Sequence, residues 1–359
     1  MDQTKTVMIE KYLSSIIHAK VQVLSIEQLG EGKVKELKSF GYGKPYLIRC
    51  KAGDDNRELV LESMSENSFG HDHFSDRAQS LLWYHSAANR LPRHARSLDV
   101  GAFTKEQQII SVGEAEEFFV LNEFVPGYEY ARDLQRIQTT GILEPLDEQR
   151  VEVLAGYLAE IHSTKSSQSA LYTRRIRDLL GHGECIMGLI DNYPSNDPIA
   201  TEERLQQVET ACLKWRWKLK SMTYRLSQVH GDFHPWNILF QDGIQFRVLD
   251  RSRGEWGEPA DDVSSLTINY IFLSLQKHGS LHSTFERVFL KFWEKYLSAS
   301  DDTEILQTVQ PFYAWRSLVL ANPMWYPRLP IPIREQLFRF ISNMLSETSF
   351  HPERINELL

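Results

Sequence analysis

The chain has 359 residues, more than a single hydrophobic core usually holds, so two lobes or domains are expected. Hydrophobic residues make up 42% and charged residues 25%, and the formal net charge of -8 argues against a nucleic-acid or membrane partner, since both need a basic face. Three widely spaced cysteines without a CxxC pair argue against a disulfide framework or a zinc site, and they favour a reducing, cytoplasmic location.

The first 20 residues predict an amphipathic helix, because Ile9, Leu13, Ile16 and Ile17 fall on one face. Charged residues interrupt the apolar run, so the segment does not resemble a signal peptide. No run elsewhere in the chain reaches the roughly 20 apolar residues that a membrane span needs.

Residues 21–66 predict a sheet, because short segments rich in Val, Leu, Ile, Phe and Tyr alternate with turn residues. The strands are expected at residues 34–40, 46–53 and 57–64. Residues 74–91 have helical spacing, and residues 108–124 predict a further hairpin with Gly113 at its turn. An antiparallel N-terminal lobe is therefore expected over residues 1–125.

The pattern changes to helices after Pro126-Gly127. Helices are expected at residues 149–165, 174–191 and 202–220, and again from Asp262 to the end. A strand-like island over residues 228–250 interrupts them. The predicted fold class is therefore α+β, with two lobes, of which the helical C-terminal lobe covers residues 126–359.

The island holds the most informative pattern, HGDFHPWN at residues 230–237, followed by Asp250. Asp232 and Asn237 are separated by four residues, the spacing of the kinase catalytic loop H-x-D-x-x-x-x-N. Phosphoryl transfer needs a carboxylate to orient a hydroxyl and accept its proton, and oxygen ligands for Mg2+. Asp232 suits the first role, and Asn237 and Asp250 suit the second. A hairpin with Asp242-Gly243 at its tip would bring the two metal ligands together.

HGDFHPWNIL resembles the catalytic loop of the aminoglycoside phosphotransferase and choline-kinase-like family, HGD-[LF]-H-x-x-N-[IV]-L. GEPADDVSSL, with Asp262 at the acidic position, resembles the following segment of that family, and LAEIHSTK resembles its helix ending in L-A-x-[IL]-H. The three matches occur in family order between about residues 150 and 270. The resemblance implies a protein-kinase-like fold that uses ATP and Mg2+ to phosphorylate a hydroxyl of a small molecule.

Other residues of this segment are expected to support the loop. His230 and His234 should brace it by hydrogen bonds, in preference to binding a metal. Asp262 should tie the loop to the helix that it begins. Trp236 stands where the family often has a small residue, and two interpretations stay open: it packs on the substrate, or it fills the lobe.

The nucleotide is expected to bind a glycine loop of the N-terminal lobe, and Gly41, Gly43 and Lys44 are the best candidates. Residues 29–33 are a rival loop, and an ordinary glycine turn is the alternative for either. A hinge between the lobes would contact the adenine through its backbone near Glu123 and Val125.

The sequence departs from the family at the strand position that normally carries a lysine, where Glu62 stands. A reversed ion pair is one interpretation, with Arg77 of the next helix facing Glu62 and reaching the phosphates. The alternatives are that Arg49 takes the lysine role, or that the chain binds nucleotide weakly and has lost catalysis.

The acceptor is expected between the catalytic loop and the C-terminal helices, where aromatic residues gather: Phe312, Tyr313, Trp315, Trp325 and Tyr326. They could hold a cationic acceptor by cation–π contact, or they could pack the core. An amino alcohol, a sugar, an amino acid or an aminoglycoside-like molecule is compatible with the sequence. Besides a kinase and an inactive kinase-like protein, a metal-dependent hydrolase using the same carboxylates and His230 is the third interpretation. The oligomeric state is left open.

Overall fold

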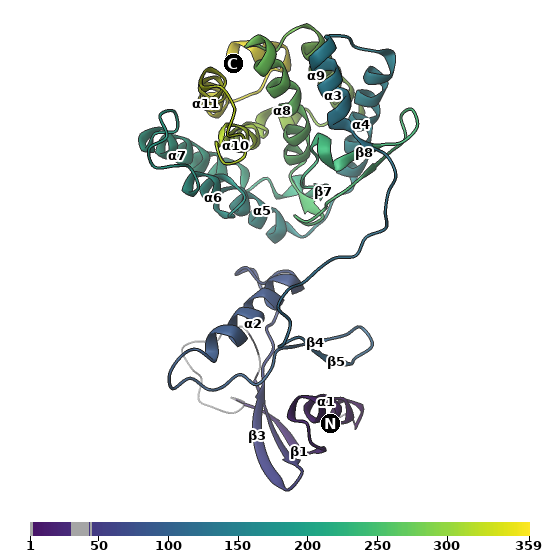
Figure 1. Cartoon of the computed structure of the whole chain (residues 1–359), viewed down its shortest axis with the longest axis vertical. Helices are drawn as coiled ribbons and strands as arrows, with labels where there is room; N and C mark the ends of the chain where they lie inside the picture. Colours follow the sequence, from purple (N-terminus) through teal and green to yellow (C-terminus); the bar gives the residue numbers. More distant parts are fainter. Residues whose placement is uncertain (1–2, 30–42, 44) are drawn as a thin grey trace. The chain divides into compact units, whose positions relative to one another are not determined.

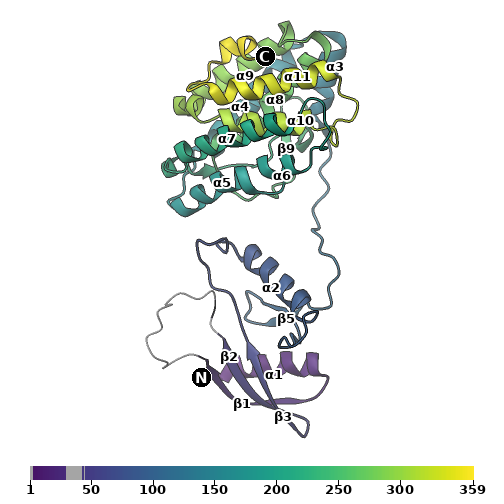
Figure 2. The ribbon, with the colours of Figure 1, turned by 90° about the vertical axis from the view of Figure 1, so that its left-hand side faces the viewer.

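The computed structural model describes residues 3–29, 43 and 45–359, so the predicted strand at 34–40 lies outside the described residues. The chain divides into two compact units, Met1–Asn122 and Glu123–Leu359. The first holds an antiparallel sheet with two helices, and the second is mainly helical (Figures 1 and 2). The predicted α+β class is confirmed. No helix of the described part of the chain has the length and apolarity needed to cross a membrane.

The N-terminal unit is built on a three-stranded sheet in the order β1-β2-β3. The helix α1 (Gln3–Ile17) precedes β1 (Val21–Gln28), β2 (Tyr46–Ala52) and β3 (Asp55–Leu61). One face of the sheet packs against α1, as the spacing of Ile9 and Leu13 predicts, and both side chains are buried against strand residues such as Ile48 and Cys50. This small core belongs to the N-terminal unit alone.

The helix α2 (Phe74–Ala88) follows the sheet and begins with a capping box at His73. The imidazole of His73 accepts a hydrogen bond from the Ser75 amide, and the Asp76 carboxylate accepts one from the His73 amide. This arrangement satisfies backbone donors that a helix start leaves free.

The hairpin predicted over residues 108–124 is wrong. The strand β5 (Ile109–Ser111) pairs with β4 (Gly101–Phe103), which precedes it, and residues 112–127 contain no strand. The chain turns between Thr104 and Gln108, where Gln107 adopts a left-handed backbone with φ of 57°. A glutamine rarely takes this conformation, so the sequence of the turn contains no glycine that would indicate it, whereas Gly113 lies outside the hairpin.

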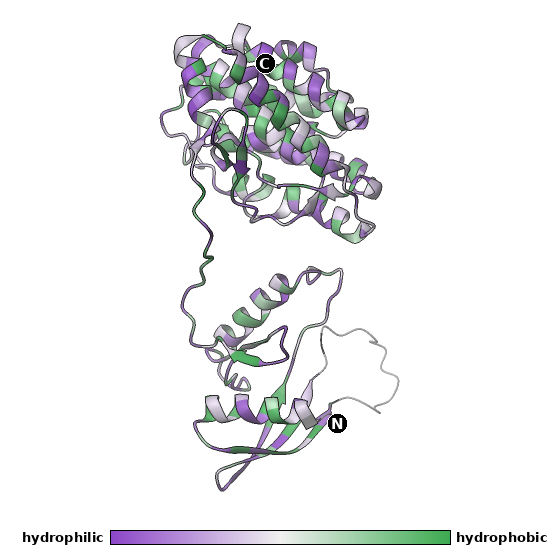
Figure 3. Ribbon diagram, turned by 90° about the vertical axis from the view of Figure 1, so that its right-hand side faces the viewer, coloured by the Kyte–Doolittle hydropathy of each residue, from purple (hydrophilic) through white to green (hydrophobic). Residues whose placement is uncertain are grey.

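The C-terminal unit contains these elements in chain order: β6 (Tyr128–Glu129), α3 (Tyr130–Thr140), α4 (Pro145–Ser163), α5 (Ser169–Gly181), α6 (Ile186–Asp191), α7 (Glu202–Leu219), β7 (Ser227–Gln228), β8 (Ile238–Phe240), β9 (Phe246–Val248), β10 (Trp256–Gly257), α8 (Pro259–His278), α9 (Ser283–Ser300), α10 (Gln310–Ala321), α11 (Ile331–Ser346) and α12 (Ile355–Leu358). The helix predicted over 174–191 is thus two helices, α5 and α6. The helix α8 is buried along most of its length and packs against α3, α4, α9 and α10. Apolar and polar residues mix along the outer helices, as expected where only one face is covered (Figure 3).

The hairpin predicted between Asn237 and Asp250 is confirmed. Ile238 of β8 lies opposite Val248 of β9, and β6 completes the small sheet on the other side of β8. Gly127 allows β6 to approach, because its φ is 148° and a Cβ atom there would lie 2.7 Å from the Phe240 carbonyl oxygen.

Candidate active site

The loop between β7 and β8 is fixed by one carboxylate at the start of α8. The backbone amides of His230 and Gly231 both donate to Asp262 at 2.7 Å. The Asp262 side chain is fully buried. The prediction that Asp262 ties the loop to its helix is therefore confirmed.

A histidine of α4 completes this anchor. The Nε2 atom of His162 lies 3.2 Å from Asp262, and its Nδ1 atom lies 2.9 Å from the Tyr296 hydroxyl. Burial raises the pKa of Asp262, but the His162 hydrogen bond, with help from the backbone donor at His230, more than offsets it, so the net pKa is lowered. Asp262 therefore accepts these hydrogen bonds as a carboxylate, and His162 is the residue of the LAEIHSTK segment that acts on the loop.

The carboxylate of Asp232 is held on one side only. Its Oδ1 atom lies 2.8 Å from Nη1 of Arg316 and 3.4 Å from Nη1 of Arg253, whereas the nearest ion-pair partner of Oδ2 among the described residues is His234 at 3.7 Å. Burial raises the pKa of Asp232, but the charges of Arg316, Arg253 and His234 outweigh burial and lower it. An ionised carboxylate that keeps one oxygen without a close ion-pair partner can accept the proton of a hydroxyl group.

Hydrogen bonds within the loop set its shape. The Asn237 amide nitrogen donates to the Asp232 carbonyl at 3.1 Å, which leaves the Asn237 side-chain oxygen for another ligand. Nδ1 of His230 accepts from the Asp232 amide, and Nδ1 of His234 accepts from the Trp236 amide. Both histidines brace the loop, as predicted. Trp236 is 43% exposed, so the interpretation that it fills the lobe is wrong.

Asp250 follows the hairpin and is exposed. The amide of its neighbour Leu249 donates to the Asn237 carbonyl at 2.8 Å, so the backbone joins the two ends of the hairpin. Asp250 has φ of 55°, a strained conformation of the kind that gathers at functional sites. No ion pair occupies its carboxylate among the described residues.

An amide oxygen and a carboxylate suit Mg2+, which binds proteins through one or two such groups and keeps waters and phosphates as its other ligands. Asn237 and Asp250 supply this donor set. Within the described residues, no group of three or more His, Cys, Asp or Glu side chains gathers that could hold a metal by itself.

Comparison with known proteins agrees with this site. The model of a phosphotransferase enzyme family matches residues 72–281, more than half of the chain and the whole of the loop and hairpin. The chain belongs to this phosphotransferase family. Membership brings with it the protein-kinase-like fold expected from the sequence. Among curated proteins, none matches the chain.

Several solved structures of small-molecule kinases are similar to the chain at low identity. A glucosamine kinase in complex with glucosamine, ADP and inorganic phosphate is 17% identical over 65% of this chain and 64% of that chain, with a TM-score of 0.43. An amicoumacin kinase is 13% identical over the full length of both chains, with a TM-score of 0.43. A choline kinase from Streptococcus pneumoniae is 13% identical over 95% of this chain and 98% of that chain, with a TM-score of 0.36. TM-scores this low identify no substrate for the present chain.

The aromatic residues near the C-terminal end belong mostly to the core of this family member. Phe312, Tyr313 and Trp315 are buried, and the Trp315 ring faces the guanidinium groups of Arg316 at 3.9 Å and Arg253 at 5.0 Å. Cations of the protein itself thus lie against the ring that could have bound a cationic acceptor. The alternative that these three rings pack the core is the correct one.

The Glu62–Arg77 pair predicted in the N-terminal unit is wrong. Arg77 donates to the carbonyl oxygens of His71 and Asp72, at 2.7 and 3.2 Å, and no ion pair joins it to Glu62, which is exposed beyond the end of β3. Arg77 lies in the first turn of α2, and its guanidinium folds back onto the loop that precedes the helix. Its reach to a phosphate stays a prediction.

The remaining predicted nucleotide residues have different fates. Gly41 and Lys44 lie outside the described residues. Gly43 pairs with Met64 in an isolated bridge, and a Cβ atom there would lie 2.0 Å from the Ser63 carbonyl oxygen. This close approach requires a glycine whether or not the residue contacts a phosphate.

Arg49, the alternative to Glu62–Arg77, forms ion pairs with Glu27 and Glu58 on the exposed face of the sheet, at 2.6 and 2.8 Å. Glu123 and Val125, the expected hinge positions, lie in a segment with neither helix nor strand. Their contact with an adenine stays a prediction.

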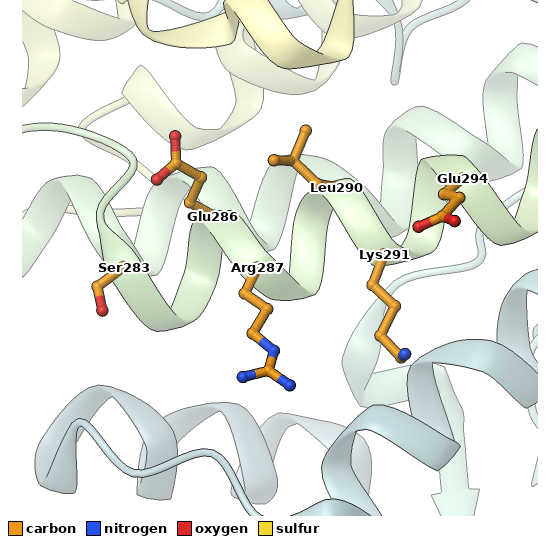
Figure 4. Close-up of a pocket in the computed structure, with 6 residues that line it drawn as sticks. All are labelled: Ser283, Glu286, Arg287, Leu290, Lys291 and Glu294. Carbon is orange, nitrogen blue, oxygen red and sulfur yellow. The ribbon is translucent and has the colours of Figure 1, made fainter.

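A separate hollow lies along α9 and is lined by six residues: Ser283, Glu286, Arg287, Leu290, Lys291 and Glu294 (Figure 4). Arg287 and Lys291 point to one side, where Glu148 and Glu152 of α4 neutralise them. Both cations of the hollow are thus paired with carboxylates of α4, and no residue of the loop between β7 and β8 lines the hollow, so it is not the candidate active site.

Proposed function

We propose that this protein transfers the γ-phosphoryl group of ATP to a hydroxyl group of a small molecule, with Mg2+ as the metal ion. The single observation behind this proposal is the carboxylate of Asp232, whose Oδ1 is held by Arg316 and Arg253, whereas Oδ2 has no ion-pair partner in the described part of the chain closer than His234 at 3.7 Å. Asp232 lies on a loop that ends at Asn237. The backbone carbonyl of Asn237 accepts a hydrogen bond from the amide of Leu249, the residue before Asp250. This combination matches what phosphoryl transfer to an alcohol requires.

In this proposal Asp232 orients the acceptor hydroxyl and accepts its proton. Asn237 and Asp250 would hold Mg2+, which would supply positive charge next to the phosphates of ATP. The residues of the loop supply no nucleophile, because the hydroxyl belongs to the acceptor. The carboxylate must therefore be ionised and correctly aimed, and it need not be a strong base.

We assign nucleotide binding to residues 1–125 and catalysis with acceptor binding to residues 126–359. Gly41, Gly43, Lys44 and Arg77 are the proposed phosphate contacts, and the backbone around Glu123 and Val125 is the proposed adenine contact. A cytoplasmic location belongs to the same proposal, since the three cysteines are free and buried and such thiols persist in a reducing compartment.

The acceptor is an amino alcohol, an aminoglycoside-like molecule, a sugar or an amino-acid-like molecule. A coupled assay of ADP release, run with Mg2+ over a panel of these acceptors, tests the proposal. Acceptor-dependent ADP release that disappears in EDTA supports it. Absence of turnover with every acceptor, at protein concentrations that detect slow enzymes, contradicts it.

A second candidate is a kinase-like protein that binds nucleotide without turnover. Glu62, which directly follows β3 where the sequence comparison expects the lysine of the family, is the observation that favours it. This candidate predicts Mg2+-dependent binding of ATP by calorimetry together with no ADP release. The third interpretation, a metal-dependent hydrolase, predicts metal binding that does not depend on nucleotide.

A further inference from the structure

Arg316 of α10 reaches the catalytic loop from the interior of the C-terminal unit. It is 7% exposed, and α10 packs between α8 and α11. One arm of its guanidinium donates to Oδ1 of Asp232 at 2.8 Å. The other arm donates to Oδ1 of Asp261 at 2.6 Å and lies 3.5 Å from the Gly231 carbonyl oxygen. The same guanidinium faces the ring of Trp315 at 3.9 Å.

The two carboxylates that Arg316 bridges come from different elements. Asp232 lies on the catalytic loop, and Asp261 lies in the first turn of α8, next to the residue that holds the loop backbone. The loop is thus fixed to α8 twice, once through its backbone by Asp262 and once through the Asp232 side chain by Arg316. A planar guanidinium with a fixed fork of donors can set the direction of a carboxylate, which a single ammonium group does less well.

We propose that Arg316 is a positioning residue, which holds the Asp232 carboxylate by Oδ1 so that Oδ2 faces the acceptor hydroxyl. This inference rests on the proposed function. Arg253 contributes less, because its contact with Asp232 is 3.4 Å long and its side chain is 23% exposed. A misplacement of about 1 Å at a reacting group can cost ~10²-fold in rate, so a residue that fixes the carboxylate affects turnover without touching substrate.

A matched control exists in the same unit. Arg334 of α11 is also 7% exposed, and it too donates to a buried carboxylate, Asp197, and to a backbone carbonyl, that of Ala321. Within the described part of the chain, it forms no hydrogen bond or ion pair with the catalytic loop. Replacement of either arginine by methionine removes a buried cation and breaks its ion pairs with carboxylates, two for Arg316 and one for Arg334, so both variants should lose stability.

The experiment compares Arg316→Met, Arg316→Lys and Arg334→Met with the unchanged protein. For each, kcat, the KM values for Mg·ATP and acceptor, and the midpoint of urea unfolding are measured. We expect Arg316→Met to lose ~10²-fold in kcat with the KM for Mg·ATP changed less than about threefold. Arg316→Lys should lose less, because one ammonium reaches one carboxylate. Arg334→Met should unfold at lower urea yet keep its kcat.

A double variant separates positioning from a general loss of structure. In the background of Asp232→Asn, Arg316→Met should cause no further loss of kcat, because the group that it positions is already changed. Equal losses of kcat in Arg316→Met and Arg334→Met would overturn the inference. It would also be overturned if Arg316→Met lowered kcat by the same factor in the Asp232→Asn background as in the unchanged protein. If Arg316→Met does not fold, Arg316→Lys decides, and full kcat in that variant overturns the inference.

Failure of the proposed function gives a different result. In that case the unchanged protein shows no acceptor-dependent ADP release, and kcat cannot be compared. Crystal structures of the unchanged protein and of Arg316→Lys then decide the inference. We expect the Asp232 carboxylate to turn away from its position in the variant, and an unmoved carboxylate with the same contacts would overturn the assignment.

Discussion

At the scale of single residues, the surroundings of Asp232 set both its charge and its direction. Burial alone would favour the protonated form, and the arginines around it reverse that effect, so the pKa of Asp232 is lowered. A carboxylate with a lowered pKa is a weak base. In phosphoryl transfer with a loose transition state, a residue that orients the hydroxyl is more useful than one that deprotonates it early.

Asp232→Asn should lose ~10²–10⁴-fold in turnover, the range typical for removal of a general base, because the amide cannot accept the hydroxyl proton. The affinity for Mg·ATP should stay nearly constant, since Asp232 is proposed to contact the acceptor. Measured kcat and calorimetric ATP binding check the two parts. Full activity in this variant would remove Asp232 from the mechanism.

Asp250→Ala should weaken Mg2+-dependent ATP binding, because an exposed carboxylate with no ion pair among the described residues is its proposed metal ligand. The folded state should survive, since the side chain is exposed. Alanine does not relieve the strain of the positive φ at this position. Asp242→Ala, at the tip of the same hairpin, is the control and should bind normally. If Mg2+ raises the ATP affinity of Asp250→Ala as much as that of the unchanged protein, the metal assignment is wrong.

At the scale of elements, the first turn of α8 organises the site. Three carboxylates at the start of this helix have separate tasks: Glu258 binds Arg225, Asp261 binds Arg316, and Asp262 binds the catalytic loop. Acidic groups are favoured at a helix N-terminus, where backbone amides and the helix dipole stabilise negative charge. One buried helix thereby aligns the loop, the arginine of α10 and the segment before β7.

The sheet of β6, β8 and β9 depends on Gly127, and Gly127→Ala tests this. The variant should be less stable than Gly141→Ala, because both glycines have positive φ but only Gly127 has a backbone atom within 3 Å of a new Cβ. Gly141→Ala should cost about 1–2 kcal/mol, the usual penalty of a left-handed alanine. Urea unfolding measures both. Equal losses of unfolding free energy in the two variants would mean that β6 can shift without cost and does not restrain β8.

At the scale of the whole molecule, the two units have cores of different size. The core of the N-terminal unit lies between α1 and one face of a three-stranded sheet, whereas that of the C-terminal unit extends around α8 through most of its helices. At ~25 cal/mol per Å2 of buried apolar surface, the larger core should contribute more to the stability of the C-terminal unit, which also holds the catalytic loop. A ligand that binds the folded chain should add to this stability.

Mg·ATP at about 100 times its dissociation constant should stabilise the protein by ~2.7 kcal/mol, because only the folded chain binds it. Scanning calorimetry would show this as a higher Tm with ATP and Mg2+ together than with either alone. Asp250→Ala should lose most of the increase. The same increase with ATP in EDTA would contradict a role for the metal in nucleotide binding.

The amino-acid sequence by itself determined the catalytic loop, the hairpin from Asn237 to Asp250 and the anchoring role of Asp262. The first two depend on residues close together in the chain, through the four-residue spacing and the Asp-Gly turn, whereas the role of Asp262, 32 residues beyond His230, followed from the resemblance to the family. Local spacing restricts the backbone directly, so such patterns keep their meaning before the rest of the fold is known.

Only the tertiary structure decided which side chains meet across the molecule. Arg316 contacts Asp232 from 84 residues further along the chain, and no spacing in the sequence indicates that pair. Arg77 points to carbonyl oxygens of its own loop instead of to Glu62. A long, flexible charged side chain can reach any of several partners, and the choice among them depends on burial and distance, which arise only when helices and sheets pack together.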